Sequence, residues 1–117
     1  MSLTSAERGV NLVISITGDI DQHNTEELRV KIDRAFERSH CKHIIFDFSA
    51  VSFMDSSGIG LLIGRYKTAS AKGGTVAIAG MTNELKRIYN ISGLKKIIKS
   101  FDTLENAEDR AASKLRA

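Results

Sequence analysis

The chain has 117 residues, of which 17 are Lys or Arg and 14 are Asp or Glu, so its formal net charge is +3. This length suits one domain over residues 1–117, with a core that needs no disulfide or metal to hold it. The apolar stretches are far shorter than the roughly 18 residues of a membrane span, and the first residues lack the pattern of a signal peptide. Cys41 has no second cysteine to pair with, so we expect a cytoplasmic protein.

Strand and helix patterns alternate along the chain. Apolar and β-branched residues predict strands over residues 11–18, 43–48 and 75–80, and a short strand within 94–101. Helical spacing predicts helices that begin at Asn24 and that cover residues 56–69, 82–93 and 103–116. Residues 3–8 carry only a weak pattern for an edge strand. The alternation predicts an α/β fold with a mainly parallel sheet of four or five strands, covered by helices on right-handed crossovers.

Each predicted helix carries a signal for its start or its buried face. Asn24 with Glu27 three residues later is a capping-box pattern, and Thr82 and Gly93 mark the ends of the third helix. The predicted apolar faces are Leu28, Ile32, Ala35 and Phe36 in the first helix, Ile59, Leu62, Ile63 and Tyr66 in the second, and Leu104, Ala107, Ala111 and Leu115 in the last.

The loops after the first three strands are expected at one edge of the sheet, because the carboxyl ends of parallel strands lie together. These loops contain the segments DIDQH, SAVSFMDSS and GMT. Ligands and partners of open α/β sheets usually bind at this edge. Asp21 and Ser56, which are distant in sequence, are therefore predicted to lie on the same rim.

The stretch FMDSSGIG, residues 53–60, invites an enzymatic interpretation that the sequence does not support. A serine nucleophile needs a base and an orienting acid, and the Gly-x-Ser-x-Gly elbow is absent. His23 is a lone histidine in a polar loop, and His40 and His43 precede the second strand, at the opposite end of the sheet. We therefore expect no hydrolase and no other enzymatic activity.

Nucleotide and metal sites are also disfavoured. The dinucleotide fingerprint needs a third glycine where Ile63 stands, and no Gly-Lys-Ser/Thr follows for a phosphate loop. Gly60 and Gly64 instead leave one helix face flat, so that another surface can approach closely. The segment HCKH, residues 40–43, has too few ligands for a zinc site. No cofactor or metal is expected.

Asp55, Ser56 and Ser57 precede or begin the second helix. Their simplest role is capping, because their oxygens accept hydrogen bonds from free backbone N–H groups. A helix N-terminus is also a favourable place for a phosphate group. A phosphate on Ser56 would add about −1.5 to −2 charges close to Asp21 and Asp55, and would change the electrostatics of the rim more than its shape.

Three segments resemble one known family. FMDSSGIGLLIGRYK, LKRIYNISGLKKII and TGDID together are similar to the anti-sigma-factor antagonists of the STAS domain family, most of all to those of the sigma-F circuit of sporulating bacteria. The resemblance extends from Val10 to Ile98. The first ten residues depart from the family pattern, which leaves the edge strand open.

The resemblance implies a STAS fold and partner switching. An unmodified antagonist binds an anti-sigma factor that is itself an ATP-dependent serine kinase, and the sigma factor is released; phosphorylation by the kinase separates the pair, and a serine phosphatase resets the switch. Carried over to this sequence, Ser56 is the phosphoacceptor and Asp21 is a partner contact. The other implied partner-binding residues are Asp55, Ser57, Gly58, Gly60, Leu61 and Gly64.

Two alternatives remain at this stage. The chain resembles, less closely, STAS subunits of other systems, such as a general-stress sigma circuit, a stressosome or a transporter-associated complex. The basic region from Lys86 to Lys99 permits a nucleic-acid-binding module, although it lacks aromatic stacking motifs. The favoured hypothesis involves neither nucleic acid nor a membrane.

Overall fold

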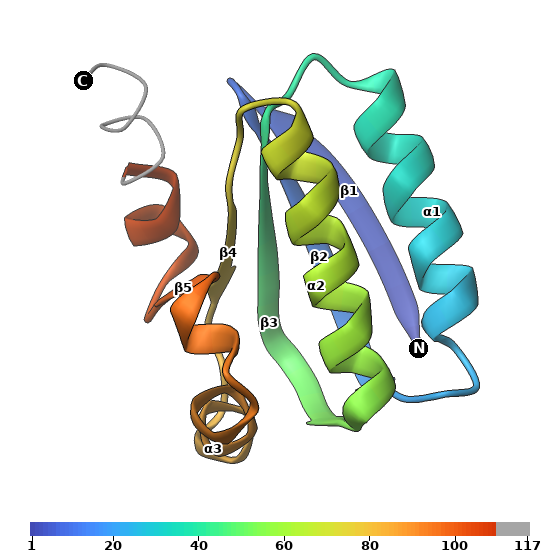
Figure 1. Ribbon diagram of the computed structural model, residues 1–117, viewed down its shortest axis with the longest axis vertical. Helices are drawn as coiled ribbons and strands as arrows, with labels where there is room; N and C mark the ends of the chain where they lie inside the picture. Colours follow the sequence, from blue (N-terminus) through green and yellow to red (C-terminus); the bar gives the residue numbers. More distant parts are fainter. Residues whose placement is uncertain (110–117) are drawn as a thin grey trace.

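The computed structural model describes residues 1–109, which form one five-stranded sheet with helices packed on it (Figure 1). In chain order the elements are β1 (Ser2–Arg8), β2 (Asn11–Ile20), α1 (Thr25–Arg38), β3 (His43–Met54), α2 (Ser56–Ala71), β4 (Val76–Ala79), α3 (Asn83–Ser92), the short 3₁₀ helix η1 (Leu94–Lys96) and β5 (Lys99–Phe101). A further helix covers residues 104–109. Within residues 1–109, no helix is long and apolar enough to cross a bilayer.

The strand order in the sheet follows the chain, from β1 to β5. β1 pairs with β2 antiparallel, and the three remaining pairs are parallel. Each parallel strand is added on the same side of the one before it, so right-handed crossovers bring α1 and α2 to the same face of the sheet, where they lie side by side (Figure 1). The predicted mainly parallel α/β fold is confirmed, and the weak pattern at residues 3–8 is a full edge strand.

The core lies between this face of the sheet and the helices. Its largest side chains are at most 1% exposed and come from alternating strand positions and from the predicted apolar faces of α1 and α2; they include Ile14, Ile16, Ile44, Phe46, Phe48, Ile78, Leu28, Ile32, Phe36 and Leu62. Burying one such side chain contributes roughly 1.5–3 kcal/mol. The apolar faces predicted for these two helices are therefore confirmed in their central residues.

A smaller cluster lies on the other face of the sheet. Ile45 and Ala79 pack there against Ala107 of the last described helix, with Phe101 and Leu104 at the margin. The predicted apolar side of the last helix is confirmed for Ala107, which is buried, and for Leu104, which is partly buried; Ala111 and Leu115 lie outside the described residues. β3 is therefore buried on both faces along its first half, as its apolar sequence predicts.

Two local predictions need correction, and a third is confirmed. β3 continues through residues 49–54, which were expected to be a loop, because Val51 and Met54 are buried. Asn24 precedes α1 but makes no capping bond; its side chain instead accepts from the Asp21 N–H at 3.0 Å and donates to the Asp19 carbonyl at 2.8 Å. The Thr82 cap of α3 is confirmed by a bond from the Leu85 N–H.

Two glycines give a test of the packing between elements. A methyl group at Gly74 would lie 1.6 Å from the Lys42 carbonyl oxygen, whereas at Gly64 it would meet nothing within 4 Å. We expect Gly74→Ala to lower the free energy of unfolding by about 2 kcal/mol or more. Gly64→Ala, in a helix with open space, should raise it by up to about 1 kcal/mol. Urea denaturation measures both, and equal effects would contradict this packing.

Candidate functional site

Asp55 joins the two loops of the rim. It is the N-cap of α2: its Oδ1 accepts from the Ser57 N–H at 2.9 Å and from the Ser57 hydroxyl. Its Oδ2 accepts from the Gln22 N–H at 3.2 Å, and its own N–H donates to the Ile20 carbonyl at 3.1 Å. The loop after β2 and the start of α2 are therefore one hydrogen-bonded unit. This confirms that the loops after the first two parallel strands share one edge of the sheet.

These hydrogen bonds favour the ionised form of the Asp55 carboxyl. The Ser57 hydroxyl has the largest effect and lowers the pKa below the ordinary value of 3.8; burial opposes it, and the backbone N–H groups of Ser57, Gln22 and Gly58 lower the pKa further. The carboxylate is therefore charged at neutral pH and holds a fixed negative charge beside the first turn of α2, where the helix dipole stabilises it.

The structure distinguishes two serines that the sequence leaves equivalent. Ser56 is the first residue of α2, is exposed, and its hydroxyl makes no hydrogen bond within residues 1–109. Ser57 is half-buried, and its hydroxyl donates to Asp55. A reagent or an enzyme that approaches from solvent therefore meets a free hydroxyl at Ser56 and an occupied one at Ser57.

Asp21 lies on the same rim in a turn that fixes its position. Its Oδ1 accepts from the His23 N–H at 2.9 Å, and its carbonyl accepts from the N–H groups of Asn24 and Thr25, both at 3.1 Å. The side chain is half-buried at the surface. With Asp55, which holds the neighbouring Gln22, it gives this rim a negative charge.

The predicted partner-binding residues of α2 fall into two groups. Gly58 and Leu61 are buried, Leu61 being 6% exposed, and a methyl group at Gly58 would lie 2.2 Å from Met54 Cγ. Gly58 thus allows α2 to begin directly against β3 and offers no surface of its own. Gly60 and Gly64 have open space where a side chain would stand. They provide the flat helix face that the sequence predicted.

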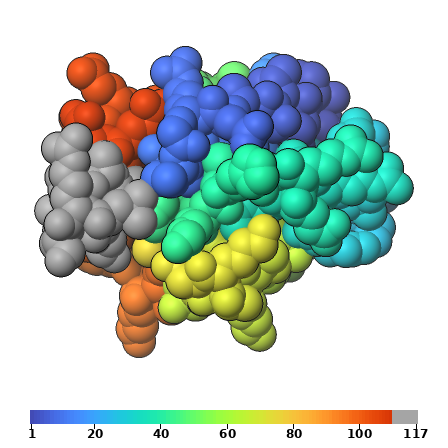
Figure 2. All heavy atoms as spheres, turned by 90° about the horizontal axis from the view of Figure 1, so that it is seen from above, coloured from blue at the N-terminus to red at the C-terminus, as the bar shows by residue number. Residues whose placement is uncertain are grey.

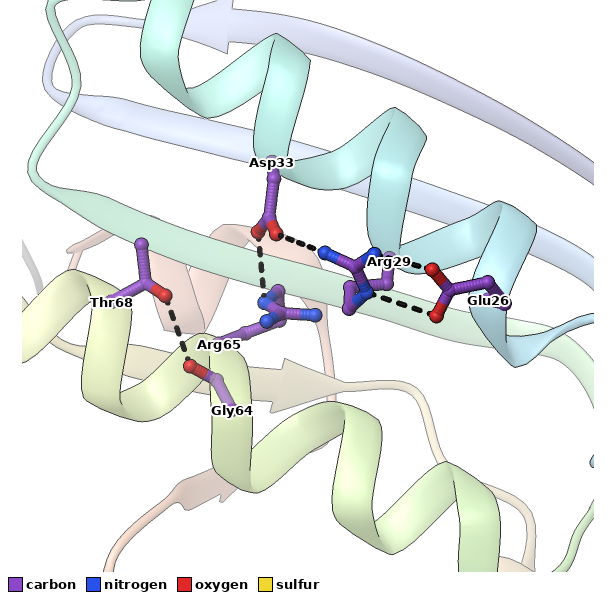
Figure 3. Close-up of polar contacts among 6 residues, drawn as sticks. All are labelled: Glu26, Arg29, Asp33, Gly64, Arg65 and Thr68. Carbon is purple, nitrogen blue, oxygen red and sulfur yellow. Dashed lines mark hydrogen bonds and ion pairs between the residues drawn. The ribbon is translucent and has the colours of Figure 1, made fainter.

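This flat face borders a shallow groove between α1 and α2. The groove is lined by Thr25, Glu26, Arg29, Ser57, Gly60, Leu61, Gly64 and Arg65. One wall is a chain of ion pairs (Figure 3): Arg65 Nε lies 3.0 Å from Asp33 Oδ1, Arg29 Nη1 lies 3.5 Å from Asp33 Oδ2, and Arg29 also pairs with Glu26. These contacts fix the spacing of α1 and α2 beside Ser57.

Arg65 is the residue of this site that the sequence analysis missed. Its side chain is only 8% exposed, and it lies on the buried side of α2 with Leu61, Leu62 and Ala69. Burial lowers the pKa of its guanidinium, and Asp33 opposes this effect, so the group stays charged. The sequence signal that could have identified Arg65 is its helical spacing from buried apolar residues such as Leu61 and Ala69.

Breaking the Arg65–Asp33 pair tests its importance for the helix pair. Asp33→Asn leaves a buried guanidinium without its carboxylate, so we expect a loss of about 1–3 kcal/mol in the free energy of unfolding, reduced because Asp33 is partly exposed. Glu26→Gln removes an exposed pair on the same face and should cause no measurable loss. Equal losses in thermal and urea unfolding would show that burial is not the deciding factor.

The Asp55 cap predicts a specific pH dependence. Because the folded pKa is below the ordinary value of 3.8, the stability that this carboxylate contributes is complete above that value and is lost as the pH falls through the folded pKa. Asp55→Asn keeps a capping side chain but cannot titrate there. The difference in unfolding free energy between wild type and Asp55→Asn should therefore be constant from pH 7 to 5 and shrink below pH 3.8. A difference that grew with acidity would contradict the assignment.

Comparison with known proteins places this site in a family context. Residues 3–107 match the family described as STAS domain. The chain is 38% identical over 100 residues to the anti-sigma F factor antagonist of Paenibacillus polymyxa, covering 86% of this chain and 85% of the relative. It is 32% identical over 88 residues to the anti-sigma-B factor antagonist of Bacillus subtilis, covering 75% and 79% of the two chains.

Solved structures agree with these sequence relatives. The anti-sigma factor antagonist SpoIIAA in its unphosphorylated form is 30% identical, with a TM-score of 0.82 over 96% of this chain and 97% of that chain. The Bacillus cell fate determinant SpoIIAA in the phosphorylated form is 31% identical, with a TM-score of 0.71 over 93% and 98%. The fold and the sequence therefore point to the same group of proteins.

Proposed function

The chain belongs to the STAS domain family, and on this premise we propose that it is an anti-sigma factor antagonist regulated by phosphorylation of Ser56. In its unmodified form it binds an anti-sigma serine kinase, and the sigma factor bound to that kinase is released. In this role the chain is a binding protein and the substrate of another enzyme, with no catalysis of its own.

The observation that carries the proposal is the free hydroxyl of Ser56. It stands exposed at the first position of α2, while the adjacent Ser57 hydroxyl is held by Asp55. A kinase transfers the γ-phosphoryl group of ATP to the serine oxygen, the hydroxyl proton leaves, and ADP is released. Of the two serines, only Ser56 offers its oxygen without first breaking a hydrogen bond. A relative that has been solved in a phosphorylated form supports phosphorylation as the regulatory step.

The added phosphate would act mainly through its charge. The first-turn N–H groups of Ser57 and Gly58 already donate to Asp55, so they are not available to bind the phosphate oxygens. The phosphate would therefore project from the rim, which already carries the carboxylates of Asp21 and Asp55. An increase of about −1.5 to −2 charges there repels a partner surface adapted to a neutral hydroxyl.

The proposed partner surface combines the rim with the exposed side of α2. Asp21, Asp55, Ser56 and Ser57 provide its polar part. Gly60 and Gly64 provide a flat part on which a partner backbone can lie, and Gly58 and Leu61 hold the helix in place from beneath. The partner class follows from the family: an anti-sigma serine kinase, with a serine phosphatase to restore the unmodified hydroxyl.

Substitutions of the two serines test this assignment. Ser56→Ala should bind the kinase with wild-type affinity and accept no phosphate, whereas Ser56→Asp should bind at least about tenfold more weakly because it introduces a charge. Ser57→Ala is the matched control and should still be phosphorylated at Ser56. Binding is measured by calorimetry and the phosphate is mapped by mass spectrometry after incubation with candidate kinases and ATP. Phosphorylation of Ser56→Ala at Ser57 would refute the assignment.

A second circuit is favoured by one specific comparison. The relative at 32% identity is an anti-sigma-B factor antagonist, so the same site suits a general-stress circuit as well as the sigma-F circuit. We propose the sigma-F circuit first because the relative at 38% identity acts on anti-sigma F. Parallel binding measurements with an anti-sigma F kinase and an anti-sigma B kinase separate the two, and preference for the latter would reassign the circuit without changing the site.

A further inference from the structure

β1 presents an open edge of the sheet. It pairs with β2 in an unbroken antiparallel register from Ser2 to Arg8, and no other strand of residues 1–109 lies on its outer side. Proteins usually protect such edges with proline, lysine or a β-bulge. β1 has none of these, because its sequence is SLTSAER and its register is continuous. Its two charged residues, Glu7 and Arg8, lie together at one end of the strand, so residues 2–6 form a small and uncharged edge.

A groove runs beside this edge, beneath α1. It is lined by Leu3, Ser5, Ala6, Glu7, Leu12, Lys31, Arg34, Ala35, Arg38 and Ser39. Its floor is made by β1 residues that pair with core positions of β2, such as Leu3 opposite Ile16 and Ser5 opposite Ile14. Figure 1 shows β1 between α2 and α1, with α1 beside it, and in Figure 2 the two elements are neighbours when seen from above. A further strand at this edge would lie next to α1, with its inward side chains in the groove.

The wall of the groove is basic. Lys31, Arg34 and Arg38 follow a spacing of three and four residues, which aligns them along one side of α1. Lys31 pairs with Glu27 at 2.9 Å, but Arg34 and Arg38 are exposed and form no ion pair within the described part of the chain. Two guanidinium groups without an ion pair therefore line the groove beside this edge, and guanidinium groups pair well with carboxylates.

We propose that the edge of β1 and the basic side of α1 form a docking site for an extended acidic segment of a partner protein. The segment adds to the sheet as a sixth strand, the mode known as β-augmentation. Its backbone bonds to the free groups of β1, its apolar side chains enter the groove over Leu3 and Ala35, and its carboxylates pair with Arg34 and Arg38. The inference goes beyond the proposed function, because none of these residues belongs to the rim.

Charge favours an acidic partner over a second copy of this chain. Two copies joined antiparallel through β1 would bring their basic rows toward each other across a twofold axis, which is unfavourable. The β1 strand of a second copy would also bring only one acidic side chain to the groove. This is Glu7, whose Oε1 already accepts from the His40 N–H at 3.3 Å. An acidic extended segment meets both the backbone and the charge requirements of the site.

The test uses a labelled synthetic peptide with the sequence Thr-Glu-Val-Glu-Val-Glu-Thr and a matched peptide with lysine in place of glutamate. We expect the acidic peptide to bind the full chain, measured by fluorescence anisotropy, and to slow amide hydrogen exchange in β1. The double variant Arg34→Glu with Arg38→Glu should bind at least about tenfold more weakly. Lys67→Glu with Lys95→Glu makes the same change in net charge elsewhere, and its affinity should stay within about twofold of wild type.

Three results would overturn the proposal. These are equal binding of the acidic and lysine peptides, a loss of affinity in the control double variant as large as in the test variant, and slower exchange outside β1 rather than within it. Dimerisation of the free chain in sedimentation, with β1 protected, would assign the edge to a second copy. Peptide binding should be the same for the unmodified protein and for the protein phosphorylated at Ser56. A failure of the peptide to bind would therefore not affect the proposal for Ser56, and a failure of the Ser56 proposal would not affect this docking site.

Discussion

The geometry of the site depends on the Asp55 carboxylate. One oxygen holds the first turn of α2 through Ser57, and the other holds the loop after β2 through the Gln22 N–H at 3.2 Å. Among residues 1–109, the other hydrogen bond at this junction is the backbone bond from the Asp55 N–H to the Ile20 carbonyl. The carboxylate also occupies the Ser57 hydroxyl and leaves that of Ser56 free. One capping residue therefore joins the two loops of the rim, adds to its charge and determines which of the two serine hydroxyls is free.

Close packing beneath the rim supports this arrangement. Gly58 lies so near Met54 that no side chain fits there, and the buried Arg65–Asp33 pair fixes α2 against α1. The helix start is thus rigid on its buried side, while Gly60 and Gly64 keep the outer side bare. A preformed and flat surface loses little conformational entropy on binding, which is consistent with the proposed role as a binding protein.

Much of this could be predicted from the sequence because its signals are local. Periodicity located the helices and the buried strands, and the parallel topology brought Asp21 and Ser56 to one rim. Competing local hydrogen bonds and contacts between distant residues were not accessible in the same way. Asn24 matches a capping box, but its side chain bonds to Asp19 and Asp21 in the loop instead. β3 extends beyond its apolar run because Val51 and Met54 are buried. Arg65 occupies a buried position of α2 because Asp33 on α1 pairs with it. The difference between Ser56 and Ser57 depends on which of the two hydroxyls the Asp55 cap accepts from, and composition alone does not decide this.

The most direct measurement compares one kinase with two homogeneous forms of this chain, unmodified and phosphorylated at Ser56. Calorimetry in the presence of ADP prevents further phosphoryl transfer during the titration. Electrostatic repulsion at the rim predicts that the phosphorylated form binds at least about a hundredfold more weakly, with its fold unchanged by circular dichroism. Equal affinities for the two forms would contradict the account, because they would mean that the charge at the start of α2 does not control binding.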